Sequence, residues 1–342
     1  MDKPLKIIVP MAGWGTRMRP HTWSKPKPLI SVAGKTALDH LMDTFHTLPQ
    51  QTSVEYVFIV SPCLGETQIP VFMNQHYPHF KVHYVVQSDM KGQSHALWLA
   101  GEYLSGPLLI IYSDTLIETD FSSLETEPCD GVAWVKPVED PRRFGVAELD
   151  EAGRIARLIE KPQGMENNLA LVGCYFLHDG QILMKAIEEQ MRRKIQLKGE
   201  YFLVDAMNIL LERGSLLRVE KVDTWLDTGT IEATLATNRY LLEHGRVISQ
   251  AVRLERVKII EPVFIHRTAE VRDSEIGPNV SIGAKCVVTN SRMENSILEE
   301  EARVVGVSLK NSLIGRQTCI HGKGPVDPVM QLNIGDNSSV VY

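Results

Sequence analysis

The sequence lacks the features of membrane-spanning and disulfide-stabilised proteins. No apolar run approaches the roughly 20 residues that a bilayer-spanning helix needs. The first residues pass from a polar start directly into a strand-like segment. The five cysteines are scattered and never spaced as C-x-x-C, which argues against a disulfide framework or a thiolate zinc site. These absences predict a soluble, cytoplasmic protein with no membrane partner.

Positive charge is not in excess either. The 36 Lys and Arg residues stand against 42 Asp and Glu, so the net charge is -6 at pH 7. A broad cationic surface for nucleic acid is therefore not expected, and an anionic ligand must be held by a local site. What the chain does have is size: 342 residues, 44% of them hydrophobic, are enough for two domains with cores of their own.

Short β-branched runs alternate with helical patterns up to about residue 240. This alternation is typical of a mostly parallel sheet covered by helices. Strands are expected at residues 6–9, 54–60, 82–86, 108–112, 131–138, 146–149, 171–177 and 216–222, and helices at residues 36–45, 94–104, 201–212 and 231–243. The last helix should end at Gly245. The pattern predicts a first domain of the α/β class over residues 1–245, with a Rossmann-like mixed sheet.

A different periodicity follows that glycine. Apolar β-branched residues recur about every six positions, at Ile259, Ile265, Val271, Ile276, Ile282 and Val288. Asp-Ser or Asn-Ser phrases also return, at residues 273, 290, 295 and 311. Such self-similarity indicates a coiled repeat, here a parallel β-helix over residues 246–342 with about four or five coils. Residues 276–287 resemble left-handed hexapeptide-repeat proteins, and an antiparallel sandwich of short strands is the alternative.

The first strand leads into a turn that contains Gly13 and Gly15. An α/β sheet binds its ligands beyond the carboxyl ends of its strands. These glycines let backbone N–H groups approach an anion, and Arg17 can bind phosphate oxygens in bidentate fashion. A Rossmann fingerprint would need a third glycine at Met18, and a Walker A loop would need one at Leu29. The turn is thus a candidate phosphate site outside both motifs.

Proline-flanked lysines follow this turn at residues 23–30. Together the two segments resemble the sugar-phosphate nucleotidylyltransferases, of the glucose-1-phosphate thymidylyltransferase and uridylyltransferase kind. Later segments agree with that family in order and spacing, at residues 87–97, 113–114, 143–148, 160–162, 172–176, 199–205 and 225–229. The resemblance implies transfer of a nucleotidyl group from dTTP or UTP to a hexose 1-phosphate, with glucose 1-phosphate the expected acceptor and pyrophosphate released.

This reaction joins two polyanions, whose repulsion is about 4 kcal/mol per unit charge pair at an effective dielectric constant near 20. A Mg²⁺ ion held by carboxylates, together with fixed cationic side chains, would offset that repulsion. The resemblance implies Asp114 and Asp227 as the Mg²⁺ ligands. It assigns Arg17 to the pyrophosphate leaving group and Lys27 to the α- and β-phosphates, with Lys25 a nearby helper. Taken alone, Asp114 could be a strand-end turn residue, and Asp227 an N-cap or Asx-turn residue.

The resemblance also assigns residues to the base and the sugar. The expected nucleotide-binding residues are Ala12, Gly13, Gly15, Thr16, Arg17, Gln87 and Gly92; the expected sugar-phosphate-binding residues are Gly145, Glu160, Lys161, Val172, Gly173 and Glu200. A glutamine amide offers both a donor and an acceptor, which suits the imide edge of thymine or uracil. Glu200 has an alternative role as a first-turn acid of the following helix, and Asp205 is a weaker candidate. Ser113 departs from the family, which commonly has glycine there.

Three alternatives stay open. The nearest is a mannose-1-phosphate guanylyltransferase, because the glycine turn and the β-helix also resemble that group. A non-catalytic regulatory subunit would be expected to have lost at least one of Arg17, Lys27, Asp114 and Asp227, yet all four are present. A second, acyltransferase site in the β-helix would need a longer stack and a catalytic histidine with a supporting motif. We instead expect the β-helix to mediate homo-oligomerisation or regulation.

Overall fold

The computed structural model describes residues 3–49, 51–245, 253–324 and 329–341. The chain forms two units: Met1–Gly13 with Leu41–Trp225, and Trp14–His40 with Leu226–Tyr342. They are called the first and the second unit below. The division differs from a single cut at residue 245, because residues 14–40 and the helix at 231–243 fold with the C-terminal coils. None of the helices in the described ranges combines the length and apolar character that a bilayer crossing requires.

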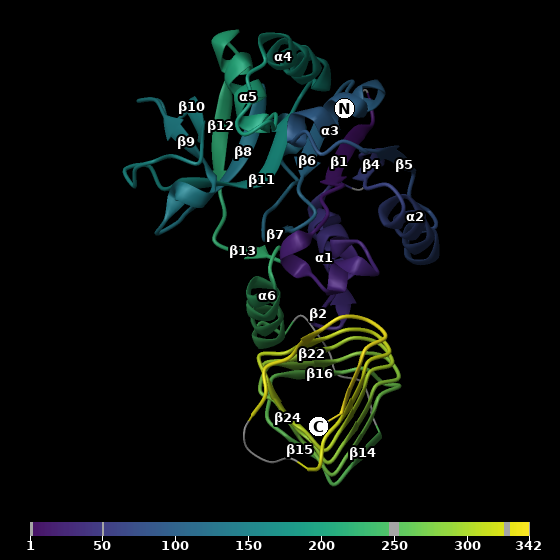
Figure 1. The fold of residues 1–342 in the computed structure, drawn as a ribbon. Helices are drawn as coiled ribbons and strands as arrows, with labels where there is room; N and C mark the ends of the chain where they lie inside the picture. The colour runs from purple at the N-terminus through teal and green to yellow at the C-terminus, as the bar shows by residue number, and fades with distance from the viewer. Residues whose placement is uncertain (1–2, 50, 246–252, 325–328, 342) are drawn as a thin grey trace. The chain divides into compact units, whose positions relative to one another are not determined.

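A nine-stranded mixed sheet forms the centre of the first unit (Figure 1). Its strands are β1 (Leu5–Met11), β4 (Val54–Val60), β5 (Val82–Val86), β6 (Leu108–Ile111), β8 (Gly131–Pro137), β9 (Gly145–Leu149), β10 (Ile155–Glu160), β11 (Leu169–Leu177) and β12 (Leu217–Lys221). The order is β10-β9-β11-β6-β1-β4-β5, with β8 paired to β11 and β12 paired to β8. Strands β6, β1, β4 and β5 are parallel, whereas β11 runs antiparallel to β6. The predicted mixed α/β sheet is confirmed.

The helices of the first unit are α2 (Leu64–His76), α3 (Gln93–Leu99), α4 (Gly180–Arg193) and α5 (Leu203–Glu212). Helix α1 (Ala37–Asp43) follows the short strands β2 (Ser31–Val32) and β3 (Lys35–Thr36), and β7 (Thr115–Ile117) follows β6. A capping box starts α1. The Thr36 N–H donates to Asp39 Oδ2 at 3.0 Å, and the Asp39 N–H donates to Thr36 Oγ1 at 3.0 Å.

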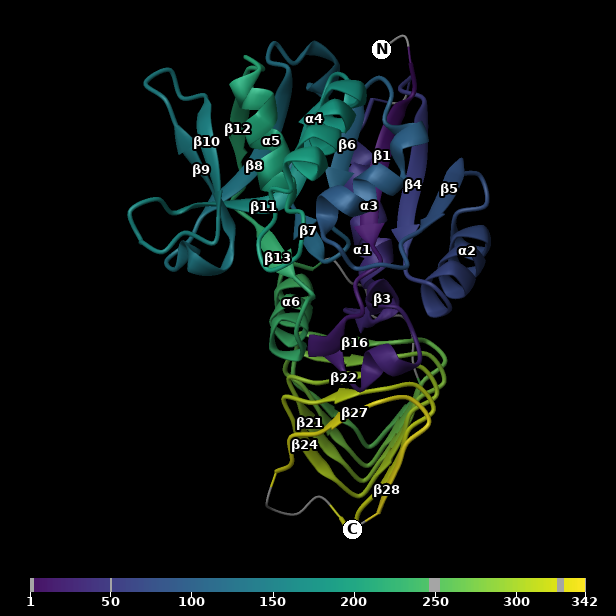
Figure 2. The ribbon, with the colours of Figure 1, turned by 45° about the horizontal axis from the view of Figure 1, so that its top comes forward.

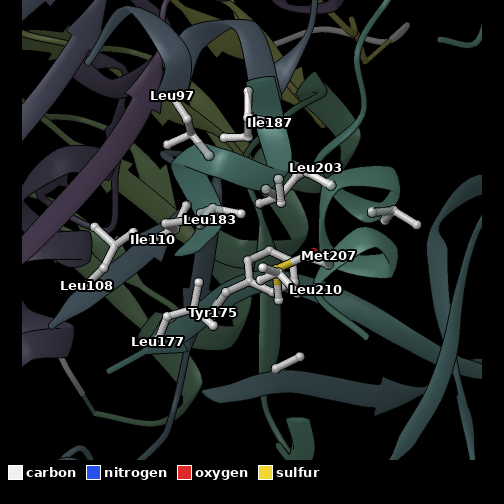
Figure 3. Close-up of a cluster of buried hydrophobic side chains, with 14 of the residues drawn as sticks. Leu97, Leu108, Ile110, Tyr175, Leu177, Leu183, Ile187, Leu203, Met207 and Leu210 are labelled. Atoms are coloured by element: carbon white, nitrogen blue, oxygen red, sulfur yellow. The ribbon is translucent and has the colours of Figure 1, made fainter. Parts of the chain in front are cut away.

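The core of the first unit lies where α4 and α5 pack on the sheet (Figure 3). Its side chains are almost fully buried and come from α3, α4, α5, β6 and β11, as Leu97, Leu108, Ile110, Tyr175, Leu177, Leu183, Ile187, Leu203, Met207 and Leu210. Full burial of each large apolar side chain contributes about 1.5–3 kcal/mol. This packing fixes β6 and β11, and therefore the turns that leave their ends.

The coils of the second unit form a left-handed parallel β-helix with three faces (Figure 1). One face is β14 (Arg253–Glu255), β17 (Glu270–Arg272), β20 (Val287–Thr289), β23 (Arg303–Val305), β26 (Cys319–His321) and β28 (Ser339–Val341). The second is β15 (Lys258–Ile259), β18 (Glu275–Ile276), β21 (Arg292–Glu294) and β24 (Ser308–Lys310). The third is β16 (Val263–Ile265), β19 (Val280–Ile282), β22 (Ile297–Leu298), β25 (Leu313–Ile314) and β27 (Asn333–Ile334). All of these strands pair in parallel, which excludes the antiparallel sandwich.

The recurring Asn-Ser phrases have a structural cause in this β-helix. Asp273, Asn290, Asn295 and Asn311 stand at corners with φ between 42° and 51°, a left-handed conformation that Asn and Asp tolerate better than most residues. The serine that follows serves the next coil: the Ser291 N–H donates to Ser274 Oγ at 3.1 Å, and the Ser312 N–H donates to Ser296 Oγ at 3.1 Å. Each phrase therefore combines a corner with a hydrogen bond between coils.

Two further parts of the second unit lie against the β-helix (Figure 2). One is helix α6 (Ile231–Glu243), which follows β13 (Trp225–Asp227). The other is the segment 14–40, with the 3₁₀ turns η1 (Thr16–Met18), η2 (His21–Trp23) and η3 (Lys27–Leu29). Met18 and Ile30 of this segment share an apolar cluster with Leu235 of α6 and with Ile297 and Leu313 of the β-helix.

Candidate active site

Three parallel strands bring the predicted base-binding residues to one edge of the sheet. Strands β1, β4 and β5 are in register, so Met11, Val60 and Val86 end at the same edge. Gln87 directly follows β5, and its N–H donates to the Val60 carbonyl at 3.0 Å. After β1 come Ala12, which is buried, and Gly13, around which an added Cβ would meet open space. This edge of the sheet therefore carries the buried amide of Gln87 and also Gly13, which has open space where a Cβ would lie.

Hydrogen bonds fix the orientation of the Gln87 amide. Its Nε2 lies 3.2 Å from the Gly92 carbonyl oxygen and 3.2 Å from His95 Nδ1. Because a carbonyl oxygen only accepts, Nε2 must be the atom that faces Gly92. Burial and the charge of Lys91 lower the pKa of His95, which favours the neutral ring, and in the tautomer with its proton on Nε2 the Nδ1 atom accepts the second amide hydrogen. With both hydrogens directed inward, the amide offers a ligand its carbonyl oxygen.

Gly92 has no room for any side chain. Its φ of 96° and ψ of −179° belong to a region that glycine alone adopts readily, and an added Cβ would lie 2.5 Å from the Tyr201 carbonyl oxygen. The Tyr201 oxygen also accepts from the Ser94 N–H at 3.0 Å, and the Tyr201 N–H donates to the Lys91 oxygen at 2.8 Å. The loop beside the predicted base site is thus bonded on both sides of Gly92 to the segment that precedes α5.

The turn after β6 carries Asp114 and is bonded to β11. The Tyr112 N–H donates to the Gly173 oxygen at 3.0 Å, and Thr115 Oγ1 donates to the Val172 oxygen at 2.7 Å. Gly173 has φ of 83°, and a Cβ there would lie 2.5 Å from the Tyr112 ring. The pairing of β11 with β8 shifts register between Leu171 and Tyr175, which marks a bulge. The structure thus brings Val172 and Gly173 to the turn that holds Asp114.

Gly145, Glu160 and Lys161, which are predicted to bind the sugar, lie close together. Gly145 pairs with Glu160 across β9 and β10, and a Cβ on Gly145 would lie 3.1 Å from Glu160 Oε2. Glu160 Oε1 is 3.3 Å from Lys161 Nζ, which lies 4.5 Å from the centroid of the Phe202 ring. Burial raises the pKa of the Glu160 carboxyl, although the neighbouring Lys161 charge opposes the shift.

Two more carboxylates act on Glu160. Asp205 and Glu200 both raise its pKa through charge repulsion, and burial raises the pKa of Asp205 itself. Asp205, not Glu200, is the acid in the first turn of α5; Glu200 is exposed and precedes the helix. Carboxyls with raised pKa values that gather beside a lysine are typical of functional sites.

The second unit carries the predicted phosphate-binding cations. Thr16 and Arg17 lie in η1 and are exposed, whereas Lys27 begins η3 and is half-buried. Gly15 has φ of 58°, and a Cβ there would lie 2.8 Å from Thr22 Cγ2. Thr22 Oγ1 donates to the Gly15 oxygen at 2.9 Å. Arg17 therefore follows a turn whose backbone is held by this hydrogen bond, and its own side chain is exposed.

Lys25 was expected to help bind phosphate, and the structure corrects this expectation. Its side chain is only 1% exposed and forms ion pairs with Glu299 and with Asp336, the latter at 3.0 Å. His21, Glu299 and Asp336 form, in the part of the chain described, a trio close enough to share a metal ion. However, both carboxylates of the trio already have cationic partners: Lys25 pairs with each of them, and Arg316 Nε lies 3.1 Å from Asp336 Oδ2. These residues are not the predicted metal ligands.

Asp227 lies in an Asx turn just before α6. Its Oδ1 accepts from the Gly229 N–H at 2.7 Å, while Thr230 caps the helix by accepting from the Ala233 N–H at 3.2 Å. The structure thus selects the turn over the N-cap among the local roles that the sequence allowed. The carboxylate is exposed, and its role toward a metal stays a prediction.

Comparison with known proteins identifies the family of the chain. The sequence profile of the family described as "Nucleotidyl transferase" matches residues 6–244. The chain belongs to the nucleotidyl transferase family. It is 30% identical to a glucose-1-phosphate thymidylyltransferase of Streptomyces antibioticus, over 98% of this chain and 99% of that protein. A glucose-1-phosphate thymidylyltransferase of Streptomyces griseus is 28% identical, over 98% of each.

A solved UDP-glucose pyrophosphorylase complexed with UDP-glucose has the same fold as the first part of this chain. It covers 71% of this chain and 100% of its own, with a TM-score of 0.60 and 21% sequence identity. The expected resemblance to sugar-phosphate nucleotidylyltransferases is confirmed. The family match and the curated relatives, and not this fold similarity, place the chain among the enzymes of nucleotidyl transfer to a sugar 1-phosphate.

Two residues of this nucleotidyl transferase were not predicted from the sequence. His95 is hydrogen-bonded to the amide of Gln87, and the backbone of Tyr201 is hydrogen-bonded to the loop around Gly92. The position of His95 on the first turn of α3, three residues after Gly92, could have indicated the first contact. Nothing in the sequence indicated the second, because both bonds of Tyr201 are formed by its backbone.

Proposed function

We propose that this protein transfers a nucleotidyl group from dTTP or UTP to glucose 1-phosphate, with Mg²⁺, and releases pyrophosphate. The observation that carries the choice of a base with a ring N–H is the buried Gln87 amide, whose hydrogens are engaged by Gly92 and His95. The curated relatives, both named as glucose-1-phosphate thymidylyltransferases over almost their full length, support the choice of base and sugar.

The amide orientation selects among bases. A carbonyl oxygen accepts, so Gln87 Oε1 suits a base with a ring N–H at that edge, which is N3–H in thymine and uracil or N1–H in guanine. Cytosine and adenine present a ring acceptor at the same place, and the contact would be repulsive. A site built to hydrogen-bond one group rejects analogues that lack it far better than an apolar pocket does. CTP and ATP are therefore the substrates that the arrangement disfavours most.

Hydrogen bonds and charge also account for the proposed recognition of the sugar 1-phosphate. An ionised Glu160 accepts from two hydroxyls of the hexose, and Lys161 compensates its charge and can reach the phosphate of the acceptor. Burial raises the pKa of Glu160 and therefore opposes its ionisation. Donor hydroxyls from the sugar favour the ionised form, so substrate binding and ionisation should support each other.

The chemistry of the donors fits a magnesium ion. Asp114 and Asp227 supply hard carboxylate oxygens, which Mg²⁺ takes together with substrate phosphates. When bound, Mg²⁺ neutralises phosphate charge and orients the reacting groups. In the proposal Arg17 stabilises the departing pyrophosphate, and Lys27 binds the α- and β-phosphates. No side chain has to act as a covalent nucleophile.

A pyrophosphate-release panel tests the proposal. It crosses dTTP, UTP, GTP, CTP and ATP with the 1-phosphates of glucose, galactose, mannose and N-acetylglucosamine, each with and without Mg²⁺. We expect dTTP or UTP with glucose 1-phosphate to be fastest and to need the metal. Preference for GTP with mannose 1-phosphate would replace this assignment by the guanylyltransferase alternative. Absence of turnover with every pair would favour a non-catalytic regulatory subunit.

A further inference from the structure

The segment that carries Arg17 and Lys27 is anchored in the β-helix by its neighbouring residues. Met18, next to Arg17, is fully buried with Ile297 of β22 and Leu313 of β25. Glycine at residue 34 brings the same segment against Phe264 of β16, since a Cβ there would lie 2.6 Å from the ring. The apolar contacts therefore hold one face of the segment while Arg17 stays exposed.

Charged contacts anchor the part that leads to Lys27. Lys25, Glu299 and Asp336 form a buried group, called the coil clamp below. Glu299 Oε1 also accepts from the Ser31 N–H at 2.9 Å, so this carboxylate is bonded to the segment on both sides of Lys27. Asp336 accepts from Ser24 Oγ at 2.8 Å.

Within the coil clamp, the surroundings of Asp336 favour its ionised form. Burial opposes ionisation of Asp336, but the charge of Lys25 and hydrogen bonds from Ser24 and from the Arg316 N–H outweigh it and lower the pKa. The side chains of Lys25 and Glu299 are each 1% exposed, and that of Asp336 is 2% exposed. In such a place the loss of one charged partner leaves another buried without compensation.

Polar contacts extend the attachment at both ends of the segment. Asn333 Oδ1 of β27 accepts from His21 Nε2–H at 2.6 Å, and Asn333 Nδ2 donates to the Arg19 oxygen at 3.3 Å. At the other end, Asn238 of α6 accepts from the Ala33 N–H at 2.9 Å and from Ser281 Oγ of β19 at 2.7 Å.

We propose that the β-helix positions Arg17 and Lys27 for the phosphates, and that Lys25 does this as a positioning residue through the coil clamp. The inference rests on the roles given to Arg17 and Lys27 in the proposed function. Displacement of a catalytic group by about 1 Å costs on the order of 100-fold in rate. The β-helix is then part of the catalytic machinery, in addition to any part in association.

The decisive variant is Glu299→Gln, which removes one charge of the coil clamp from the β-helix side and leaves Lys25 in place. If Lys25 positions the segment, Glu299→Gln and Lys25→Met should each lower kcat at least about tenfold, and the double variant should be no worse than the more damaged single one. KM for the sugar 1-phosphate should change less than about twofold, since the predicted sugar residues lie in the first unit. Lys25→Arg should restore most of kcat.

Lys285→Met is the matched control. Lys285 pairs with Glu301 at 2.9 Å on the same β-helix, but it is exposed. Its replacement should leave kcat within about twofold of the wild type, because exposed ion pairs contribute little. The proposal is overturned if Glu299→Gln also keeps wild-type kcat, the result expected if Lys25 contacts phosphate directly.

Hydrogen exchange gives a readout that does not depend on turnover. In Glu299→Gln, amides of residues 14–31 should exchange faster than in the wild type, while those of β1, β4 and β6 should not change. Equal exchange in both proteins would refute the clamp. If the wild type turns over no substrate pair, the proposed function fails and the exchange comparison still tests the clamp. If Glu299→Gln does not fold, Asn333→Ala takes its place in the same comparison.

Discussion

Replacement of Gly92 by alanine tests the link between the base loop and the segment before α5. The backbone at Gly92 has φ of 96° and ψ of −179°, and holding a non-glycine residue there costs roughly 1–3 kcal/mol. The new Cβ would lie 2.5 Å from the oxygen and 2.7 Å from the nitrogen of Tyr201. Those atoms are backbone, so relief of the contact adds about 1–3 kcal/mol. We expect a loss of stability of roughly 2–6 kcal/mol.

Gly153→Ala is the matched control for this prediction. Gly153 also has a positive φ, 76°, but an added Cβ there meets nothing within 4 Å. Its replacement should cost only the backbone preference, about 1–2 kcal/mol. The difference between the two variants therefore isolates the contact with Tyr201.

Thermal unfolding and steady-state kinetics measure the effect. At about 2–4 °C per kcal/mol for a domain of this size, Gly92→Ala should lower Tm by on the order of 10 °C, and Gly153→Ala by clearly less. Because the Gly92 oxygen holds Gln87 Nε2 at 3.2 Å, KM for the nucleotide should also rise about tenfold or more, with little change for the sugar 1-phosphate. Equal melting temperatures and equal nucleotide KM values for the two variants would refute the close approach on which this reasoning depends.

Three further predictions concern charge. Asp114→Asn should reduce kcat by at least about 100-fold and weaken the dependence on Mg²⁺, measured by metal titration of pyrophosphate release; full activity would remove Asp114 from the metal site. With burial raising the pKa of Glu160, log(kcat/KM) for the sugar should fall as pH drops through that raised pKa, and Glu160→Gln should abolish this limb of the pH profile. Hydrogen bonds from Lys6 and Lys81 lower the pKa of Glu55 to about 2, so its stabilisation is present above its unfolded pKa near 4.5 and is lost as pH falls toward 2. Glu55→Gln should therefore be less stable than the wild type in denaturant titrations at pH 7 and similar to it near pH 2.

The sequence predicted most strands well because burial on both faces makes them continuous apolar runs. Residues 54–60 match β4, which is buried along most of its length, and residues 82–86 match the half-buried edge strand β5, in each case at both ends. The helix expected at residues 94–104 divides instead into α3 and a 3₁₀ turn at Gly101–Tyr103, since glycine at residue 101 weakens the helix. Helix α2 was not predicted, and its internal Pro70 explains why, because proline in a helix interior removes a backbone donor.

Tertiary contacts decided the start of α5. The helix expected from Tyr201 begins at Leu203. The N–H and carbonyl of Tyr201 are bonded to Lys91 and Ser94, so these groups are not available to continue the helix backward. A single sequence does not show such a competitor, which lies about a hundred positions away.

Residues of the candidate site were likewise predictable where the local sequence determines their position, and not where distant residues do. Positions such as Gln87 and Asp114 follow strands, and the end of a parallel strand is where function is expected in an α/β sheet. Lys25 was misjudged because an isolated lysine is normally solvated, and only the coils bring Glu299 and Asp336 to it. The role of Lys25 depended on partners encoded at the far end of the chain.

The hexapeptide pattern of the β-helix, taken alone, predicts coils that stack on one another. Its inward residues do so: Val271, Val288 and Val304 are fully buried in register on one face. Other positions on the coils do not serve the stack. Glu299 and Asp336 would be costly to bury for stability alone, because a buried ion pair rarely outweighs its desolvation. Their presence is accounted for by what they hold, which is the segment that carries Arg17 and Lys27. The buried charges of Glu299 and Asp336, unlike the exposed charges of Asp273 and Lys285, therefore mark where the segment is attached to the coils.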